Sequence, residues 1–271
     1  MPIYKTLDNY NLTLANRIID KYPTGFIGGI IEGERGYGKS AYALKVMAQV
    51  YHKLKPELTD EQCWDTALDN MLFSMEDTIK FIDNNIKKHI VTPVWTLDDA
   101  TVHFCSYKFF TNLYEVILVH GMFDTIRTVC TGLLLTCPKR EMLLSALRNY
   151  DDFKIEIIMH HDYERIARGY KIKTSPMGQK RIYKNYEDNF SCYLPDKVYE
   201  KYMVKRNYYL DQVNNELQEI MKNKTKNVKI KDIKSKLMEV GLKKQIEKMQ
   251  RTAMIEGAGE VADSSEEDNG T

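Results

Sequence analysis

The chain has 271 residues and is nearly neutral, with 39 Lys and Arg against 38 Asp and Glu. Hydrophobic residues make up 43% and charged residues 28%, which is ordinary for a globular protein. The sequence has no apolar run near the roughly 18 residues of a membrane span, no signal-peptide pattern, and no C-x-x-C pair among its five cysteines. We therefore expect a cytoplasmic protein with no membrane partner, no disulfide framework and no zinc knuckle.

Helices and strands alternate along most of the chain. The predicted helices are 12–22, 40–54, 60–69, 77–88, 107–131 and 141–149, and the predicted strands are 26–32, 71–74, 89–97, 132–138 and 153–159. Two hairpin arms, 166–173 and 181–194, follow around the turn sequence TSPMGQ, and a helix then runs from Pro195 to about Met221. This alternation predicts an α/β fold, with a parallel sheet covered by helices on both faces.

The segment GERGYGKS, Gly33 to Ser40, matches the phosphate-loop pattern G-x-x-x-x-G-K-[ST] between a predicted strand and a predicted helix. Its glycines let backbone N–H groups turn toward an anion at the helix N-terminus. Lys39 is expected to reach the β- and γ-phosphates of ATP, and the Ser40 hydroxyl to bind Mg²⁺. A chance glycine-rich turn is the alternative. The expected nucleotide-binding residues are Gly33, Glu34, Arg35, Gly36, Tyr37, Gly38, Lys39, Ser40 and Ala41.

Two acids, Asp98 and Asp99, follow the predicted strand 89–97. Asp98 is expected to hold Mg²⁺, and Asp99 to act as the general base toward an attacking water. The alternative is that both acids merely cap the following segment. The 57 residues between Ser40 and Asp98 leave room for a helix, a strand and a second helix. That insertion favours an ATPase over a small-molecule kinase.

Other polar residues are weaker candidates. Thr136 ends the strand GLLLT and could touch the γ-phosphate or orient the water, or be a simple strand-end residue. Arginines could stabilise transition-state charge, although each is also explained as a surface residue: Arg35, Arg127, Arg140 and Arg148. Three histidines have no acidic or cysteine partner at ligand spacing and are interpreted as structural: His103, His160 and His161. The tyrosines of the last helix are interpreted as packing surface rather than base-stacking groups: Tyr199, Tyr202, Tyr208 and Tyr209.

The charge is unevenly distributed at the C-terminal end. Residues 222–251 carry eleven basic and three acidic side chains, whereas residues 252–271 carry six acidic and no basic ones. The basic segment predicts binding to DNA or another polyanion, because clustered lysines neutralise phosphates. A plain charged helix face and a contact with the acidic tail are the alternatives. The tail itself has the composition of a disordered segment.

Several stretches resemble a known family: GERGYGKS followed by YALKV, then CWDTALDNMLF, LDDA, IRTVCTGLLLTCP and LPDKVYEKY. They are similar to P-loop ATPases, often labelled DnaA-like or AAA-type, of archaeal spindle-shaped viruses (fuselloviruses) and related plasmids. The resemblance spans roughly residues 18–220. It implies an ASCE-type ATPase core with Asp99 where Glu is usual, so that hydrolysis is slow or the protein is a switch. It also favours Arg127 and Arg148 among the arginines.

Together these features predict a P-loop NTPase core at 1–165, a β-hairpin and helix extension at 166–221, a basic helical segment at 222–251 and an acidic tail at 252–271. The expected function is Mg²⁺-dependent ATP hydrolysis in the host cytoplasm, coupled to viral or plasmid DNA. Replication initiation or helicase loading is preferred over packaging or partition. An arginine from a neighbouring subunit would require a homo-oligomer, as a ring or filament. The alternatives are a non-hydrolysing ATP switch and a small-molecule or nucleotide kinase.

Overall fold

The computed structural model describes residues 6–102, 104, 121, 123, 125–148, 153–161, 163–174 and 180–227. The chain divides into two units, Met1–Leu210 and Asp211–Thr271, and the description below concerns the first. Most of the predicted helix 107–131, most of the basic segment and the whole acidic tail lie outside the described residues. A search of the described helices finds none that could cross a membrane.

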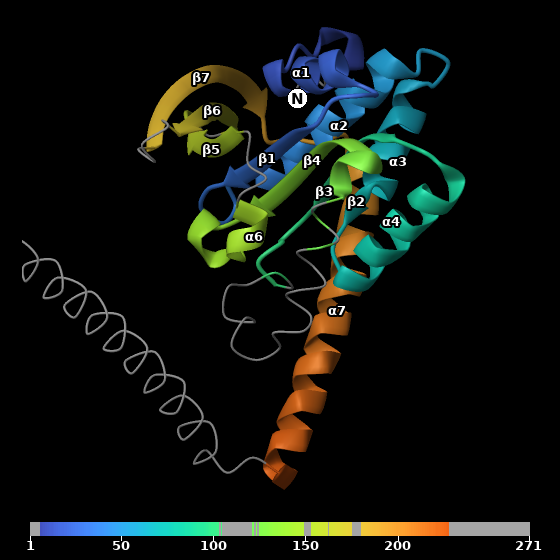
Figure 1. Cartoon of the computed structure of the whole chain (residues 1–271), viewed down its shortest axis with the longest axis vertical. Helices are drawn as coiled ribbons and strands as arrows, with labels where there is room; N and C mark the ends of the chain where they lie inside the picture. Colours follow the sequence, from blue (N-terminus) through green and yellow to red (C-terminus); the bar gives the residue numbers. More distant parts are fainter. Residues whose placement is uncertain are drawn as a thin grey trace, which may run out of the picture. The chain divides into compact units, whose positions relative to one another are not determined.

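One seven-stranded sheet runs through the first unit, in the spatial order β2-β3-β4-β1-β5-β6-β7 (Figure 1). The strands are β1 Ile27–Glu32, β2 Met71–Leu72, β3 Thr92–Leu97, β4 Cys130–Cys137, β5 Phe153–Met159, β6 Glu164–Thr174 and β7 Lys180–Ser191. Strands β1 to β5 pair in parallel, whereas β6 and β7 pair antiparallel to their neighbours. The predicted parallel sheet is confirmed. The predicted hairpin extends that same sheet.

In the described part of the chain, six α-helices surround or follow these strands. They are α1 Thr13–Lys21, α2 Lys39–Leu54, α3 Asp60–Asp69, α4 Met75–Lys88, α6 Ser145–Arg148 and α7 Asp196–Asn227. Short 3-10 turns are η1 Leu7–Asn9, η3 Ile126–Thr128 and η4 Arg140–Met142. Helix α3 begins at a capping box, in which Thr59 and Gln62 each bond the other's backbone N–H. Ser74 likewise caps α4 by accepting from the Asp77 amide.

Successive side chains of the central strands point to opposite faces of the sheet, so each face carries its own apolar layer. On one face α1 lies close to β4, because Gly132 has no side chain: an added Cβ would stand 3.1 Å from Ile18 methyl groups. On the other face Trp95 and Leu133 join a buried cluster with Ile82 of α4 and Leu147 of α6. With both faces covered, the ends of the parallel strands are the places where polar side chains can gather.

Two helix predictions are wrong in part. Within the predicted helix 107–131, residues 126–128 form a 3-10 turn and Cys130 already begins β4, because the Val129 carbonyl accepts from the Thr92 amide of β3 at 2.9 Å. The predicted helix 141–149 is broken into η4 and α6. There the Leu144 amide donates to the Phe104 carbonyl at 2.9 Å, so a tertiary bond replaces a helical one.

Candidate nucleotide site at the carboxyl edge of the sheet

The carboxyl ends of β1, β3 and β4 meet at one edge of the sheet. Strand β4 lies between β1 and β3, although it follows both in the chain. The loop after β1 and the acids after β3 are therefore brought to the same edge, flanking the end of β4. In open parallel sheets this edge is where ligands bind.

The loop Gly33–Ser40 curls back on itself before α2 begins at Lys39. Gly38 precedes the helix with φ +88°, a left-handed conformation that favours glycine. A Cβ at Gly38 would also stand 3.1 Å from the Cβ of Cys192, so the loop packs closely against the segment after β7. The result is a helix N-terminus with free amide groups behind a tight loop, which is an anion-binding arrangement.

Lys39 lies inside this loop and is only 8% exposed. Its Nζ donates to the carbonyl oxygens of Gly33 at 2.8 Å and Glu34 at 2.9 Å. Burial lowers the pKa of Lys39, and the charges of Asp99 and Asp98 act in the opposite direction. The ammonium group is thus placed in the concave side of the loop, where a phosphate oxygen could replace a carbonyl as its partner.

Asp98 is fully buried, and side-chain hydroxyl groups hold both of its carboxylate oxygens. Oδ1 accepts from Ser40 Oγ at 2.8 Å and from Thr136 Oγ1 at 2.6 Å, and Oδ2 accepts from Tyr202 Oη at 3.0 Å. Burial and the neighbouring charge of Asp99 raise the pKa of Asp98. The Ser40 hydroxyl and the Asp98 carboxylate form a pair of adjacent oxygen donors beside the phosphate loop. This donor set fits Mg²⁺, which binds through one or two such groups together with phosphate oxygens.

Asp99 stands next to this pair in a left-handed conformation, with φ +48°. Its backbone amide donates to Thr136 Oγ1 at 2.9 Å, so Thr136 contacts both acids. The Asp99 carboxylate is more exposed than that of Asp98 and pairs with Arg206 at 3.2 Å between Oδ2 and Nη2. The structure therefore brings together four of the predicted residues, Ser40, Asp98, Asp99 and Thr136.

The predicted arginines are spread along the sheet. Arg140 follows β4 at this edge, where its amide donates to Glu32 Oε2 at 3.2 Å. Arg127 lies in η3, before the amino end of β4, so the eight residues Cys130–Cys137 separate it from the loop edge. At about 3.3 Å per residue, that separation is roughly 25 Å. Arg148 ends α6, and its carbonyl oxygen accepts from the Arg140 guanidinium at 3.0 Å. Arg35 is exposed in the loop itself.

Two contacts at the site were not anticipated from the sequence. Tyr202 was expected to be packing surface, but its hydroxyl donates to Asp98, and Arg206, one turn further along α7, pairs with Asp99. Their spacing of four residues is the one available signal, because it places both side chains on one face of a helix. The expectation that His160 and His161 lack an acidic partner is wrong: a Glu164 oxygen and both imidazoles lie within 4.8 Å of one another, all on exposed residues.

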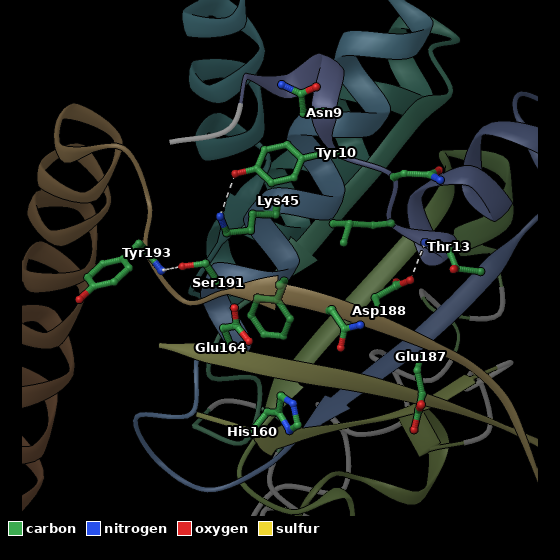
Figure 2. A pocket seen from close by; sticks show the side chains of 14 residues that line it. Asn9, Tyr10, Thr13, Lys45, His160, Glu164, Glu187, Asp188, Ser191 and Tyr193 are labelled. Atoms are coloured by element: carbon green, nitrogen blue, oxygen red, sulfur yellow. Dashed lines mark hydrogen bonds between the residues drawn. The ribbon is translucent and has the colours of Figure 1, made fainter. Parts of the chain in front are cut away.

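A separate cavity of about 680 Å³ lies between the N-terminal segment, α2 and β7 (Figure 2). Figure 2 shows Lys45 pointing toward Tyr10 and Asp188 toward the backbone of Thr13. Lys45 Nζ donates to Tyr10 Oη at 2.9 Å, and Asp188 accepts from the Thr13 amide at 2.7 Å. None of its lining residues belongs to the loop Gly33–Ser40 or to the pair Asp98 and Asp99. Its polar groups support the fold, because Asp188 also accepts from the Tyr42 hydroxyl of α2.

Comparison with known proteins finds sequence relatives in viruses. The chain is 27% identical over 228 residues to the uncharacterized protein B-251 of Sulfolobus spindle-shape virus 1, covering 80% of this chain and 89% of the relative. It is 28% identical over 160 residues to the uncharacterized protein ORF286 of Acidianus two-tailed virus, covering 56% of this chain and 51% of that protein. No family model matches the chain.

Solved structures with similar chains include the N-terminal domain of zonular occludens toxin from Neisseria meningitidis, at 16% identity and a TM-score of 0.35 over 65% of this chain and 98% of that one. The genome packaging NTPase B204 of Sulfolobus turreted icosahedral virus 2, in complex with ATP-gammaS, matches at 14% identity and a TM-score of 0.35, over 59% and 98%. From its own sheet order and loop, this chain has an α/β P-loop NTPase fold, and it has relatives in archaeal viruses.

Proposed function

We propose that the chain is a Mg²⁺-dependent ATPase acting in a DNA transaction of a virus or plasmid. The observation that carries the proposal is the cluster at the sheet edge, where Ser40 and Thr136 both donate to the buried Asp98. Three elements distant in the chain converge on one buried carboxylate beside a phosphate loop. A fold does not need such a group for stability, since burying a carboxylate is costly.

The chain's own residues suffice for phosphoryl transfer to water. The loop amides and Lys39 would hold the β- and γ-phosphates, while Ser40 and Asp98 would hold the metal ion. Mg²⁺ supplies charge stabilisation for the phosphate oxygens when bound. Asp99 would then orient the attacking water and accept its proton. Aspartate is one methylene shorter than glutamate, so we expect turnover to be slow.

The DNA component of the proposal depends on the basic segment 222–251 and on the viral origin of the relatives. Among DNA transactions we favour replication initiation or helicase loading, followed by packaging or partition. A homo-oligomer is part of this proposal. Arg127 lies before the amino end of β4, so it could act only on the site of a neighbouring subunit, and we propose the same route for Arg148.

The test is phosphate release from ATP and Mg²⁺, with and without single- and double-stranded DNA, by the wild-type chain and by Lys39→Ala. We expect slow turnover that DNA stimulates and that the variant lacks. Tight ATP binding without phosphate release would replace the ATPase by a nucleotide-dependent switch. Transfer of phosphate to an added acceptor would replace it by a kinase. Turnover that DNA leaves unchanged would remove the DNA coupling.

A further inference from the structure

Helix α7 brings a cation to the nucleotide site from within the same chain. Arg206 Nη2 lies 3.2 Å from Asp99 Oδ2, and the neighbouring turn of the helix bonds Asp98 through Tyr202 at 3.0 Å. Both carboxylates that the proposed reaction needs are therefore in contact with one face of α7. The sequence distance of about a hundred residues between these partners shows that the contact is tertiary.

This part of α7 is fixed in place by contacts on either side of Arg206. Lys201 Nζ lies 2.6 Å from Asp65 Oδ1, and Lys205 Nζ donates to the Leu68 carbonyl at 2.6 Å, so α7 is attached to α3. The rings of Tyr202 and Tyr209 pack on Phe73, with centroids 6.2 and 5.5 Å away. Arg206 thus reaches the site from a rigid element, which is what positioning a charge requires.

The donors of Arg206 are only partly used. One Nη holds Asp99, whereas its Nε is buried and has no hydrogen-bond partner in the described part of the chain. Buried donors are almost always satisfied, so an exception needs an explanation. A guanidinium group presents donors in a planar fork that matches phosphate oxygens. The unused buried donor points to a further acceptor at this place, and a phosphate has the matching chemistry.

The charges near Arg206 also indicate an anionic ligand. Lys39 and Arg206 are two cations near the same two carboxylates. Burial is the main cause of the lowered pKa of Lys39, and the charge of Arg206 is a smaller cause that acts in the same direction. A magnesium ion at Ser40 and Asp98 would add two further positive charges. The triphosphate would compensate for this excess of positive charge.

We propose that Arg206 is a catalytic residue that contacts the γ-phosphate of ATP in cis, with Tyr202 as the residue that positions α7. This inference rests on the proposed function. In the step itself, a water oxygen forms the new bond to the γ-phosphorus, the bond to the β–γ bridging oxygen breaks, and the water proton goes to Asp99. Arg206 donates hydrogen bonds to the γ-phosphate oxygens and is not consumed. A neighbouring subunit's arginine is then not required for the chemistry.

The discriminating measurement is the ratio of ATP to ADP affinity, because only ATP has a γ-phosphate. We expect Arg206→Gln to weaken ATP binding on the order of tenfold or more, as for loss of a charged hydrogen bond. ADP binding should change by less than about twofold, and turnover should fall on the order of 10²-fold or more. Arg206→Lys retains the positive charge but not the planar pair of donors, so its ATP affinity and turnover should lie between those of the wild type and Arg206→Gln. Lys80→Gln, which removes a positive charge from an exposed pair with Glu76 on α4, is the control and should match the wild type.

The outcomes separate this inference from the proposed function. Equal losses of ATP and ADP affinity in Arg206→Gln, or an unchanged ATP to ADP ratio with normal turnover, would overturn the role of Arg206 while leaving the ATPase in place. A wild-type chain that binds neither nucleotide with Mg²⁺ would instead overturn the proposed function. If Arg206→Gln does not fold, as judged by thermal unfolding, the same ratio measured in Arg206→Lys decides the question.

Discussion

Two buried aspartates lie in the two halves of the sheet and have different partners. Asp98, after the parallel strand β3, accepts from three side-chain hydroxyls among the described residues, those of Ser40, Thr136 and Tyr202. Asp188, on the antiparallel strand β7, accepts from the Thr13 and Leu14 amides at the start of α1, and from one hydroxyl. A buried acid that binds amides at a helix start supports the fold. The partners of Asp98 are side-chain hydroxyls, which can rotate toward a bound ligand, whereas backbone amides at a helix start are fixed.

The largest effect is expected for Asp98→Asn, which should lower turnover on the order of 10²-fold or more. The free energy of unfolding, in contrast, should be higher in this variant than in the wild type. Because burial raises the pKa of Asp98, the folded state binds its proton more tightly than the unfolded state does. That contribution to stability is present at low pH and is lost as the pH rises through the raised pKa.

Asn carries no titrating group, so the variant should be more stable than the wild type at pH 7. The pH-dependent part of the difference should disappear below the ordinary carboxyl pKa of about 3.9, where the wild-type group is protonated in both states. Thermal unfolding without nucleotide, followed from pH 7 to about pH 3, measures this. A variant less stable than the wild type at pH 7 would show that Asp98 is a structural acid like Asp188.

For Asp188→Ala we expect the reverse pattern. The variant loses three hydrogen bonds to a carboxylate, two of them at the start of α1, and should be destabilised by about 2–3 kcal/mol. Denaturant unfolding gives this number. ATP affinity, measured on the folded fraction, should stay within about twofold of the wild type, since the cavity at Asp188 is separate from the loop. If the folded Asp188→Ala variant did not bind ATP, the antiparallel half of the sheet would also contribute to nucleotide binding.

Thr136→Val tests the link between the two acids at smaller magnitude. The hydroxyl donates to Asp98 and accepts from the Asp99 amide, and valine has the same shape without either bond. We expect turnover to fall about tenfold and stability by about 1–3 kcal/mol, the cost of leaving buried polar groups unpaired. Thr136→Ser, which keeps the hydroxyl, is the matched control. Normal turnover in the valine variant would assign Thr136 to the fold alone.

The smallest effect is expected on the outer hairpin. Arg168 Nε lies 2.6 Å from Glu187 Oε1 across β6 and β7, and Lys184 contacts the same oxygen at 2.7 Å. Because these side chains are partly exposed and Lys184 remains, Arg168→Ala should shift the midpoint of denaturant unfolding only slightly. The difference should shrink in high salt. A large, salt-insensitive loss would mean that the antiparallel half depends on its charges as much as the edge of the parallel half does.

The phosphate loop and the acids after β3 were predictable because short-range signals carry them. The spacing of Gly33, Gly38 and Lys39 is a local pattern, and an apolar run ending in two acids predicts a strand with its tip at a site. Strand-end placement likewise brought Thr136 into consideration. Local patterns therefore sufficed to find the strands of the parallel half, although the start of β4 was predicted as helix.

Tertiary contacts account for what the sequence could not give. Tyr202 and Arg206 look like any tyrosine and arginine on a charged helix, and only the packing of α7 against α3 and Phe73 turns them toward Asp98 and Asp99. The break between η4 and α6 likewise depends on the Leu144–Phe104 backbone bond. Local patterns contain no information on either contact.

The central claim is that the loop edge of the parallel half binds ATP with Mg²⁺, and isothermal titration calorimetry tests it most directly. We compare the wild type with Lys39→Ala and with Lys45→Met, a second buried lysine of α2, which bonds Tyr10 instead of the loop. The prediction is Mg²⁺-dependent ATP binding by the wild type and Lys45→Met, weakened on the order of 10²-fold in Lys39→Ala. Equal binding by all three proteins, or loss only in Lys45→Met, would contradict it.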